Sequence, residues 1–339
     1  MPSCAPMSRE NPIITLVLKT VVEVKTVGPD IDIQITALSL GQAFRVALNT
    51  RDKILAQFKY ADLGESTLNL SFSVKEKDPV YVDSATCTSI LTIDFTKAYA
   101  LNGSKTVTVD LIGAKEGPNR PTRDGQWRFE LEWYLAPNVQ DTIRYIHGEM
   151  IRNLGTVDFA FMNKEWSDFQ TLKWYEKVLP LGEADDLVSG GLALHRWRSM
   201  VGYGKPWDHK PCIFAETGKA AFHLDRMLEF RFDVWSNVHY GFVGSAIGFP
   251  TKLLIDGAGF AQATRDGVPS SEIARKASEG KLYELDHPED TAAIKLGARL
   301  WSRYGVALTK ESLEIEVLKT GFKIERSRTS ASAIKEYKK

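Results

Sequence analysis

The sequence lacks most of the patterns that assign a chain to a known chemistry. It has three cysteines in 339 residues, widely spaced and without a CxxC pair. This spacing indicates neither a disulfide framework nor a thiolate zinc site, so we expect Cys212 to be an inert buried thiol. The phosphate-binding patterns GxGxxG and GxxxxGK[ST], the GxSxG elbow and the HExxH zinc pattern are also absent. Their absence leaves nucleotide-binding, serine-hydrolase and zinc-protease functions without support.

Neither sign of charge is in excess, and there is no long apolar run. Lys plus Arg and Asp plus Glu each number 43, which gives a net charge of zero. A protein that holds a long polyanion usually shows a basic excess, so the balance favours a glycan over a nucleic acid. The sequence contains no run of about 18 apolar residues, so it predicts no membrane span. Because the N-terminus has no basic region followed by an apolar segment, we expect no cleavable secretory signal.

Residues 1–136 have the pattern of an all-β domain. Short runs rich in Val, Ile, Thr and aromatic residues alternate at period two, and clusters of Gly, Asn, Asp and Pro separate them. About eight strands at this spacing predict an antiparallel β-sandwich. The region contains no histidine, and its acidic residues fall at turns or on solvent faces. We therefore interpret it as a binding or delivery domain.

Residues 137–326 are predicted to form a mostly helical domain with a small β-hairpin, lysozyme-like or similar, and residues 327–339 a loose basic tail. The chain as a whole is therefore expected to be an α+β protein of two domains. All six histidines and six of the eight tryptophans lie in the second region. This asymmetry places any chemistry there.

The first candidate group lies on a helix predicted near residues 140–154. Tyr145, Glu149 and Asn153 follow one edge of its apolar stripe at i, i+4 and i+8. A carboxylate at such a margin can have its pKa raised by desolvation, which suits Glu149 to be a general acid. The alternative is an ordinary solvated helix residue.

The second candidate group is the loop Trp207-Asp208-His209-Lys210. Extended backbone would point Asp208 and Lys210 to one side and Trp207 and His209 to the other. A close charge pair would then lie beside an aromatic platform. The alternative is a turn in which Asp208 is a structural cap.

The third group lies on a helix predicted between Arg231 and Pro250, which carries no Lys, Arg or Glu after Arg231. Asp233, Asn237 and Tyr240 share one face of this helix with two glycines. A helix that is apolar nearly all round is buried, and burial of these polar groups costs a few kcal/mol each unless they find partners. The face therefore either closes an internal hydrogen-bond network or lines a substrate cavity. His239 lies away from it, where a core histidine is the alternative to a catalytic one.

Imidazole and carboxylate groups are also normal metal ligands. His209, Asp208, Asp233 and His239 can be drawn as such a site. No local ligand spacing supports it, so we expect neither a metal nor an organic cofactor.

Three of these segments together resemble a known family. Glu149-Met150 with Asn153, the loop Gly204-Lys205-Pro206-Trp207-Asp208-His209-Lys210, and Asp233-x-x-x-Asn237-x-His239-Tyr240-Gly241-x-x-Gly244 resemble the bacterial polymorphic toxin type 44 domain over about residues 140–306. The resemblance implies a C-terminal toxin of a contact-dependent or type VI-like system, paired with an immunity protein. It also implies delivery without a signal peptide into a target bacterium, with the N-terminal domain contacting the secretion machine.

Three functions remain open, in order of preference. The first is hydrolysis of the peptidoglycan glycan, with Glu149 as general acid and Asp233 or Asp208 as the second carboxylate. Asn153, Asn237, Tyr240, Trp207 and Lys210 would bind the substrate. The second is a ribonuclease that uses His209 with His239 or Glu149, and Lys210 at the phosphate. The third is a binding effector without catalysis. Periplasmic action is expected for peptidoglycan and cytoplasmic action for RNA.

Overall fold

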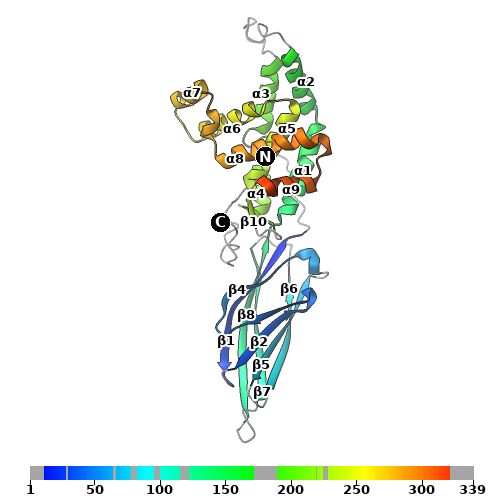
Figure 1. Ribbon diagram of the computed structural model, residues 1–339, viewed down its shortest axis with the longest axis vertical. Coiled ribbons are helices and arrows are strands. Elements are labelled where there is room, and N and C mark those ends of the chain that lie inside the picture. The colour runs from blue at the N-terminus through cyan, green and yellow to red at the C-terminus, as the bar shows by residue number, and fades with distance from the viewer. Residues whose placement is uncertain are drawn as a thin grey trace. The chain divides into compact units, whose positions relative to one another are not determined.

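The computed structural model describes residues 11–27, 30–63, 66–77, 82–94, 100–114, 122–171, 189–218, 220–223 and 228–320. The chain divides into two compact units. As far as these are described, the first contains residues 11–138 and 221–229 and the second residues 139–218 and 230–320. The first is built of strands and the second mainly of helices, which confirms the α+β class (Figure 1).

The first unit is an antiparallel sandwich of two four-stranded sheets, as the alternating pattern predicted. One sheet has the order β4-β1-β8-β7, with β4 at Arg51–Lys59, β1 at Ile13–Lys25, β8 at Arg123–Ala136 and β7 at Ala100–Ala114. The other has the order β3-β2-β5-β6, with β3 at Gln42–Val46, β2 at Ile31–Ala37, β5 at Thr67–Lys77 and β6 at Val82–Thr92. All paired neighbours are antiparallel.

The sandwich core forms because alternate residues of each strand point between the sheets. On β5, Leu68, Leu70, Phe72 and Val74 are fully buried while the residues between them are not. The ring of Phe72 lies 5.1 Å from that of Phe129 on β8 and joins the two layers. One continuous apolar cluster thus draws on both sheets.

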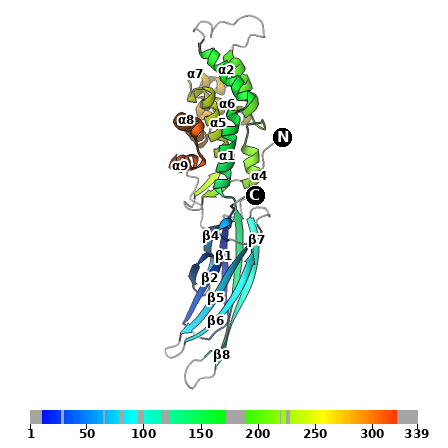
Figure 2. The same cartoon turned by 90° about the vertical axis from the view of Figure 1, so that its right-hand side faces the viewer.

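The helical unit is arranged around α5, Phe232–Ile247. It contacts α1 (Val139–Leu154), α2 (Val157–Thr171), α4 (Lys210–Thr217), α6 (Thr251–Arg265) and α8 (Pro288–Tyr304), as Figures 1 and 2 show. The other helices are α3 (Ser189–Val201), α7 (Ser270–Ser278) and α9 (Lys310–Thr320). Nearly every residue of α5 is buried, as its apolar composition predicted.

The helices α5 and α8 are in backbone contact at two glycines. A Cβ added to Gly241 would lie 2.1 Å from the carbonyl oxygen of Ile294, and one added to Gly297 would lie 2.1 Å from that of Val238. Only glycine permits this approach. The contact brings the N-terminal end of α8 beside the polar face of α5.

Several local patterns have a different outcome in the structure. Residues 213–233 predict a hairpin or strand pair with a turn at Thr217-Gly218, but the first part belongs to helix α4, and the strand pair forms between β9 (Ala220–His223) and β10 (Leu228–Arg231). The segment after α6 is rich in Asp, Gly, Pro and Ser, which predicts a loop, but it contains helix α7. The Gly- and Pro-rich residues 201–211 predict an interruption, which the structure shows, although Pro211 lies in the first turn of α4, where proline is favourable. The pattern of residues 313–327 fits a strand pair or a helix, and its described part belongs to helix α9.

Two further findings concern the ends of the chain and the cysteines. Cys212 is disulfide-bonded and therefore not the free thiol that was expected. Its partner, and the predicted tail at residues 327–339, lie outside the described residues. Sequence separation did not reveal the bond because it does not report distance in space. Within the described ranges, no helix is both long and apolar enough to cross a membrane.

Candidate active site

The loop before α4 is held by three buried side chains. Trp207, Asp208 and His209 are 5%, 6% and 3% exposed. The backbone of His209 is helical, so the predicted extended geometry of this loop is wrong. The structure instead anchors three consecutive residues and leaves the half-buried Lys210 to begin α4.

Asp208 is bonded to its own loop. Its two carboxylate oxygens accept the backbone N–H groups of Gly204 at 2.9 Å and Lys210 at 3.2 Å. This is the capping role that was the alternative to a catalytic one. Trp207 packs against the rings of Trp197, at 6.1 Å, and His239, at 6.4 Å. Its buried ring offers almost no face to a sugar.

The geometry predicts that Asp208→Ala lowers the stability of the protein more than its activity. Two N–H groups would lose their acceptor, which costs about 1 to 3 kcal/mol in a buried turn. We expect a matching fall in the free energy of unfolding, measured by urea denaturation, with residual activity in the folded fraction. Full stability with complete loss of activity would instead assign Asp208 to catalysis.

His209 and His239 lie side by side in the interior. Their ring centroids are 4.4 Å apart in a T-shaped arrangement. His209 Nδ1 lies 3.1 Å from the hydroxyl of Tyr145, and His239 Nε2 lies 2.8 Å from Nδ2 of Asn153. The second ring nitrogen of each histidine is buried without a hydrogen-bond partner.

Burial keeps both imidazoles neutral. Desolvation, followed by the charge of Arg152, lowers the pKa of His209 to about 4. Desolvation also lowers the pKa of His239 well below its ordinary value, with His209 and Arg152 adding to the effect. His239 is fully buried, so neither ring is exposed to a macromolecular substrate as the structure stands.

Glu149 belongs to the same interior group. It is 4% exposed and forms an ion pair with Arg152. Desolvation raises its pKa, and Arg152 opposes the change. Its charge also contributes, after desolvation, to the raised pKa of Tyr145. These interactions lie between α1 and the histidines, whereas Asp208 caps its loop, so the structure gives these two carboxylates separate roles.

A second polar group gathers near the first turns of α5 and α8. Asp233 forms an ion pair with Arg231, and Arg231 also lies 3.5 Å from Glu289. The charge of Asp233 acts on Asp290, in the first turn of α8. The charge of Lys210 acts on Asp290 and on Asp286. We call Asp233, Asp286 and Asp290 the carboxylate cluster.

Burial raises the pKa of two members of the carboxylate cluster, Asp286 and Asp290. Desolvation, followed by the charge of Asp290, raises the pKa of Asp286 to about 6. Desolvation raises the pKa of Asp290, and Lys210 opposes the change. The carboxyl oxygen Oδ2 of Asp286 is buried without a hydrogen-bond partner. Asp286 is therefore a partly exposed acid that is poised near neutral pH.

The polar face of α5 borders this cluster. Asn237 is one turn after Asp233, and its Nδ2 is buried without a hydrogen-bond partner. The hydroxyl of Tyr240 donates to the carbonyl oxygen of Leu254 at 3.2 Å. Desolvation raises the pKa of Tyr240 to about 12, and the charge of Asp286 contributes. The stripe predicted on this helix thus faces carboxylates that sequence reasoning did not select.

In the sequence alone, Asp286 and Asp290 indicate only an acidic N-terminal turn of a helix, which suits the helix dipole. The available signal was the concentration of acids in Asp286-His287-Pro288-Glu289-Asp290, directly before a helix that carries a packing glycine. Nothing in that segment shows which other segment it faces. The contact between α5 and α8 supplies this information.

Comparison with known protein families matches the part of the chain that contains this cluster. Residues 196–303 match the bacterial toxin 44 family. The match confirms the resemblance drawn from the sequence motifs and indicates a bacterial toxin. A comparison with curated proteins finds no match.

The toxin 44 segment, residues 196–303, contains Lys210, the polar face of α5 and the whole carboxylate cluster. It begins after α1, so Tyr145, Glu149 and Asn153 lie outside it. The region over which the resemblance was drawn, about 140–306, is therefore longer than the matched segment.

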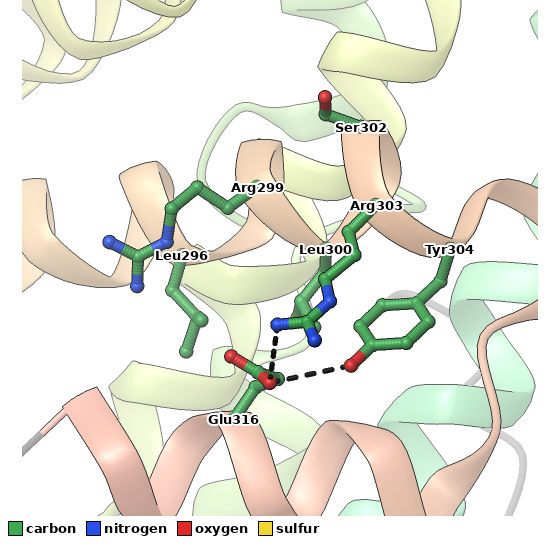
Figure 3. A pocket seen from close by; sticks show the side chains of 7 residues that line it. All are labelled: Leu296, Arg299, Leu300, Ser302, Arg303, Tyr304 and Glu316. Atoms are coloured by element: carbon green, nitrogen blue, oxygen red, sulfur yellow. Dashed lines mark hydrogen bonds and ion pairs between the residues drawn. The ribbon is translucent and has the colours of Figure 1, made fainter.

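A surface pocket of about 240 Å³ lies between α8 and α9, at the end of the toxin 44 segment. Figure 3 shows its lining, with Arg303 and Tyr304 directed toward Glu316. The Glu316 carboxylate accepts hydrogen bonds from Arg303 at 3.1 Å, Tyr304 at 3.3 Å and Lys319 at 3.0 Å. These bonds, led by Lys319, lower the pKa of Glu316. The carboxylate is thus committed to joining α9 to α8.

The described side chains of this region do not gather as a set of metal ligands. Throughout the described ranges, no three His, Cys, Asp or Glu side chains gather in a way that could hold a metal ion. The set drawn from the sequence divides instead between the histidine pair, the Asp208 turn and the carboxylate cluster.

Proposed function

We propose that the toxin 44 segment is a glycoside hydrolase that cleaves the glycan of bacterial peptidoglycan. The observation that carries the proposal is Asp286: a partly exposed carboxyl group with a raised pKa, beside Asp290 and within one charged cluster with Asp233. Glycosidases use two carboxyl groups whose environments separate their pKa values, so that one is an acid and the other is ionised. In the carboxylate cluster, Asp286 has the raised pKa and Asp233 is paired with Arg231.

In this proposal Asp286 donates its proton to the glycosidic oxygen as that bond breaks. Asp233, which is ion-paired with Arg231, stabilises the positive charge that develops on the sugar or activates the attacking water. Asp290 couples the two residues: its charge raises the pKa of Asp286, and the charge of Asp233 raises the pKa of Asp290. Asn237, whose buried Nδ2 has no hydrogen-bond partner, and Tyr240, which is kept protonated and donates to Leu254, border the cluster from α5.

The general acid in this proposal is Asp286, whereas the sequence favoured Glu149. Glu149 interacts with Arg152 and Tyr145 of its own helix, α1. Desolvation raises the pKa of Asp286 as it does that of Glu149, and the neighbouring carboxylate of Asp290 raises it further. The proposal therefore keeps the reaction class and transfers the acid role to α8.

Electrostatics favours a glycan over RNA as the substrate. Four carboxylates, including Glu289, lie with one lysine and one arginine, and such a surface repels a phosphodiester backbone. The histidines on which a ribonuclease mechanism depended are buried. A glycan substrate also fits action in the periplasm, and we propose a cognate immunity protein that blocks the cluster there.

The substrate is tested by incubating the purified full chain with peptidoglycan sacculi and, separately, with total RNA. We expect release of soluble muropeptides with new reducing ends, and intact RNA. The Asp286→Asn variant is the matched control and should release none. Degraded RNA with intact sacculi would replace the proposal by a ribonuclease, and no change in either substrate would favour a binding effector.

A further inference from the structure

The histidine pair has no part in the proposed reaction, yet it joins the toxin 44 segment to a helix outside that segment. Tyr145 and Asn153 of α1 are two turns apart, and each makes a hydrogen bond to one imidazole. Both imidazoles are buried and neutral. Buried polar groups with such long-range partners fix the geometry of the segments that carry them.

One of these imidazoles belongs to the residue before Lys210. His209 is packed against His239 on one side and lies edge-on to the ring of Tyr145, with centroids 5.7 Å apart. Asp208 accepts the backbone N–H of Lys210 itself. The side chains of Asp208 and His209 therefore both fix the backbone at Lys210. Lys210 thus begins α4 at a fixed backbone position, and its charge acts on Asp286 and Asp290.

We infer that Tyr145 and Asn153 are positioning residues of the active site: their hydrogen bonds hold the rings of His209 and His239, and the held ring of His209 places Lys210 beside Asp286 and Asp290. The inference rests on the proposed function only for the role of the cluster. It makes α1 a working part of the toxin although the family match begins after it.

The consequence is electrostatic. The charged and titratable groups that act on Asp286 are Asp290 and His287 at the start of α8, Lys210 on α4, and Tyr240 on α5. Of these, Lys210 is the cation held by the histidine pair, and its charge lowers the pKa of Asp286. If Lys210 loses its position, the pKa of Asp286 rises. The pH above which Asp286 is deprotonated, and can no longer donate a proton, rises with it.

The experiment is a titration of the Asp286 carboxyl by NMR in the full chain labelled with ¹³C, with the resonance assigned by its loss in Asp286→Asn. Lys210→Met sets the scale, and we expect it to raise the pKa of Asp286 by about 0.5 to 1. Tyr145→Phe and Asn153→Ala should each raise this pKa by at least about half as much. Tyr203→Phe, at an 83% exposed ring of the same unit, is the control and should leave it unchanged.

A pKa of Asp286 that moves in Lys210→Met but not in Tyr145→Phe or Asn153→Ala would overturn the inference. No movement in Lys210→Met would overturn it as well, because Lys210 would then not lie beside the acid. This readout needs no substrate, so it stays decisive if the chain cleaves no glycan. Where glycan is cleaved, Tyr145→Phe should lower kcat more than it changes KM and shift the descending limb of the pH profile upward.

Discussion

Replacing Asp286 by Asn is expected to abolish glycan cleavage and leave the protein folded and slightly more stable at pH 7.5. Asn keeps the shape of the side chain but cannot donate a proton to the leaving oxygen. Loss of a general acid typically lowers the rate by about 100- to 10,000-fold. Muropeptide release from sacculi and survival of bacteria that express the variant in the periplasm measure the effect.

The gain in stability follows from the direction of the pKa shift. The pKa of Asp286 is raised in the folded state to about 6, from an ordinary value of 3.8. Its contribution to stability is therefore fully present below about pH 4 and is lost as the pH rises through 6. At pH 7.5 the ionised carboxylate lowers the free energy of unfolding, and replacement by Asn removes this effect. Because the group is partly exposed, solvent screening reduces the effect to about 1 kcal/mol.

Thermal unfolding at pH 4 and pH 7.5 checks this second half of the prediction. The parent and Asp286→Asn should differ at pH 7.5 and converge at pH 4. Asp266→Asn, at an exposed position of the same unit, is the control and should change neither value. An Asp286→Asn variant that keeps full activity would remove Asp286 from the mechanism, and one that is less stable at pH 7.5 would contradict the desolvation of its carboxyl.

Replacing Gly297 by Ala should produce the largest loss of stability from a single methyl group. The added Cβ would lie 2.1 Å from the carbonyl oxygen of Val238 and 2.6 Å from the backbone nitrogen of Phe242. These are backbone atoms of α5, so no side chain can rotate away and the helices must separate. Overpacking of this kind typically costs about 1 to 3 kcal/mol and here should reach the upper value or exceed it.

The same change should also lower activity in the folded molecules. Asp290 lies in the first turn of α8 and Asp286 just before this helix, so separation of α8 from α5 moves both away from Asp233. Urea denaturation and muropeptide release together report both effects. Gly148→Ala on α1 is the matched control: its Cβ would meet nothing within 4 Å, so the variant should be stabilised by about 0.5 to 1 kcal/mol. A Gly297→Ala variant as stable as the parent would contradict the close approach of the two helices.

The elements that were predicted well are those whose evidence is local. Alternation at period two identified the sandwich, because side chains of a strand point to opposite faces whatever else is present. Helical periodicity identified α5 as a buried helix with Asp233, Asn237 and Tyr240 on one face. His239 was recognised as a possible core histidine with one satisfied nitrogen, and it has that environment.

The elements that were missed depend on contacts between distant segments. Asp208 and Lys210 were taken as a charge pair on extended backbone, but the carboxylate caps the loop and the lysine begins a helix. Asp286 carried no sign of a raised pKa, because desolvation and the charge of Asp290 arise only once α8 is packed. Glu149 was placed correctly at the margin of its helix, but the partner across that margin was unknown.

The sequence by itself determined that a sandwich precedes a helical region, that α5 is buried, and that the motifs of the toxin 44 segment lie there. These follow from the direction in which each residue type and spacing points its side chains. Only the tertiary structure decided that Asp286 acts on Tyr240 of α5 and Asp233 of α5 on Asp290, while Tyr145 and Asn153 of α1 bond the histidine pair. The physical reason is that a pKa and a hydrogen bond depend on distance in space, and here the glycine contact between α5 and α8 sets that distance.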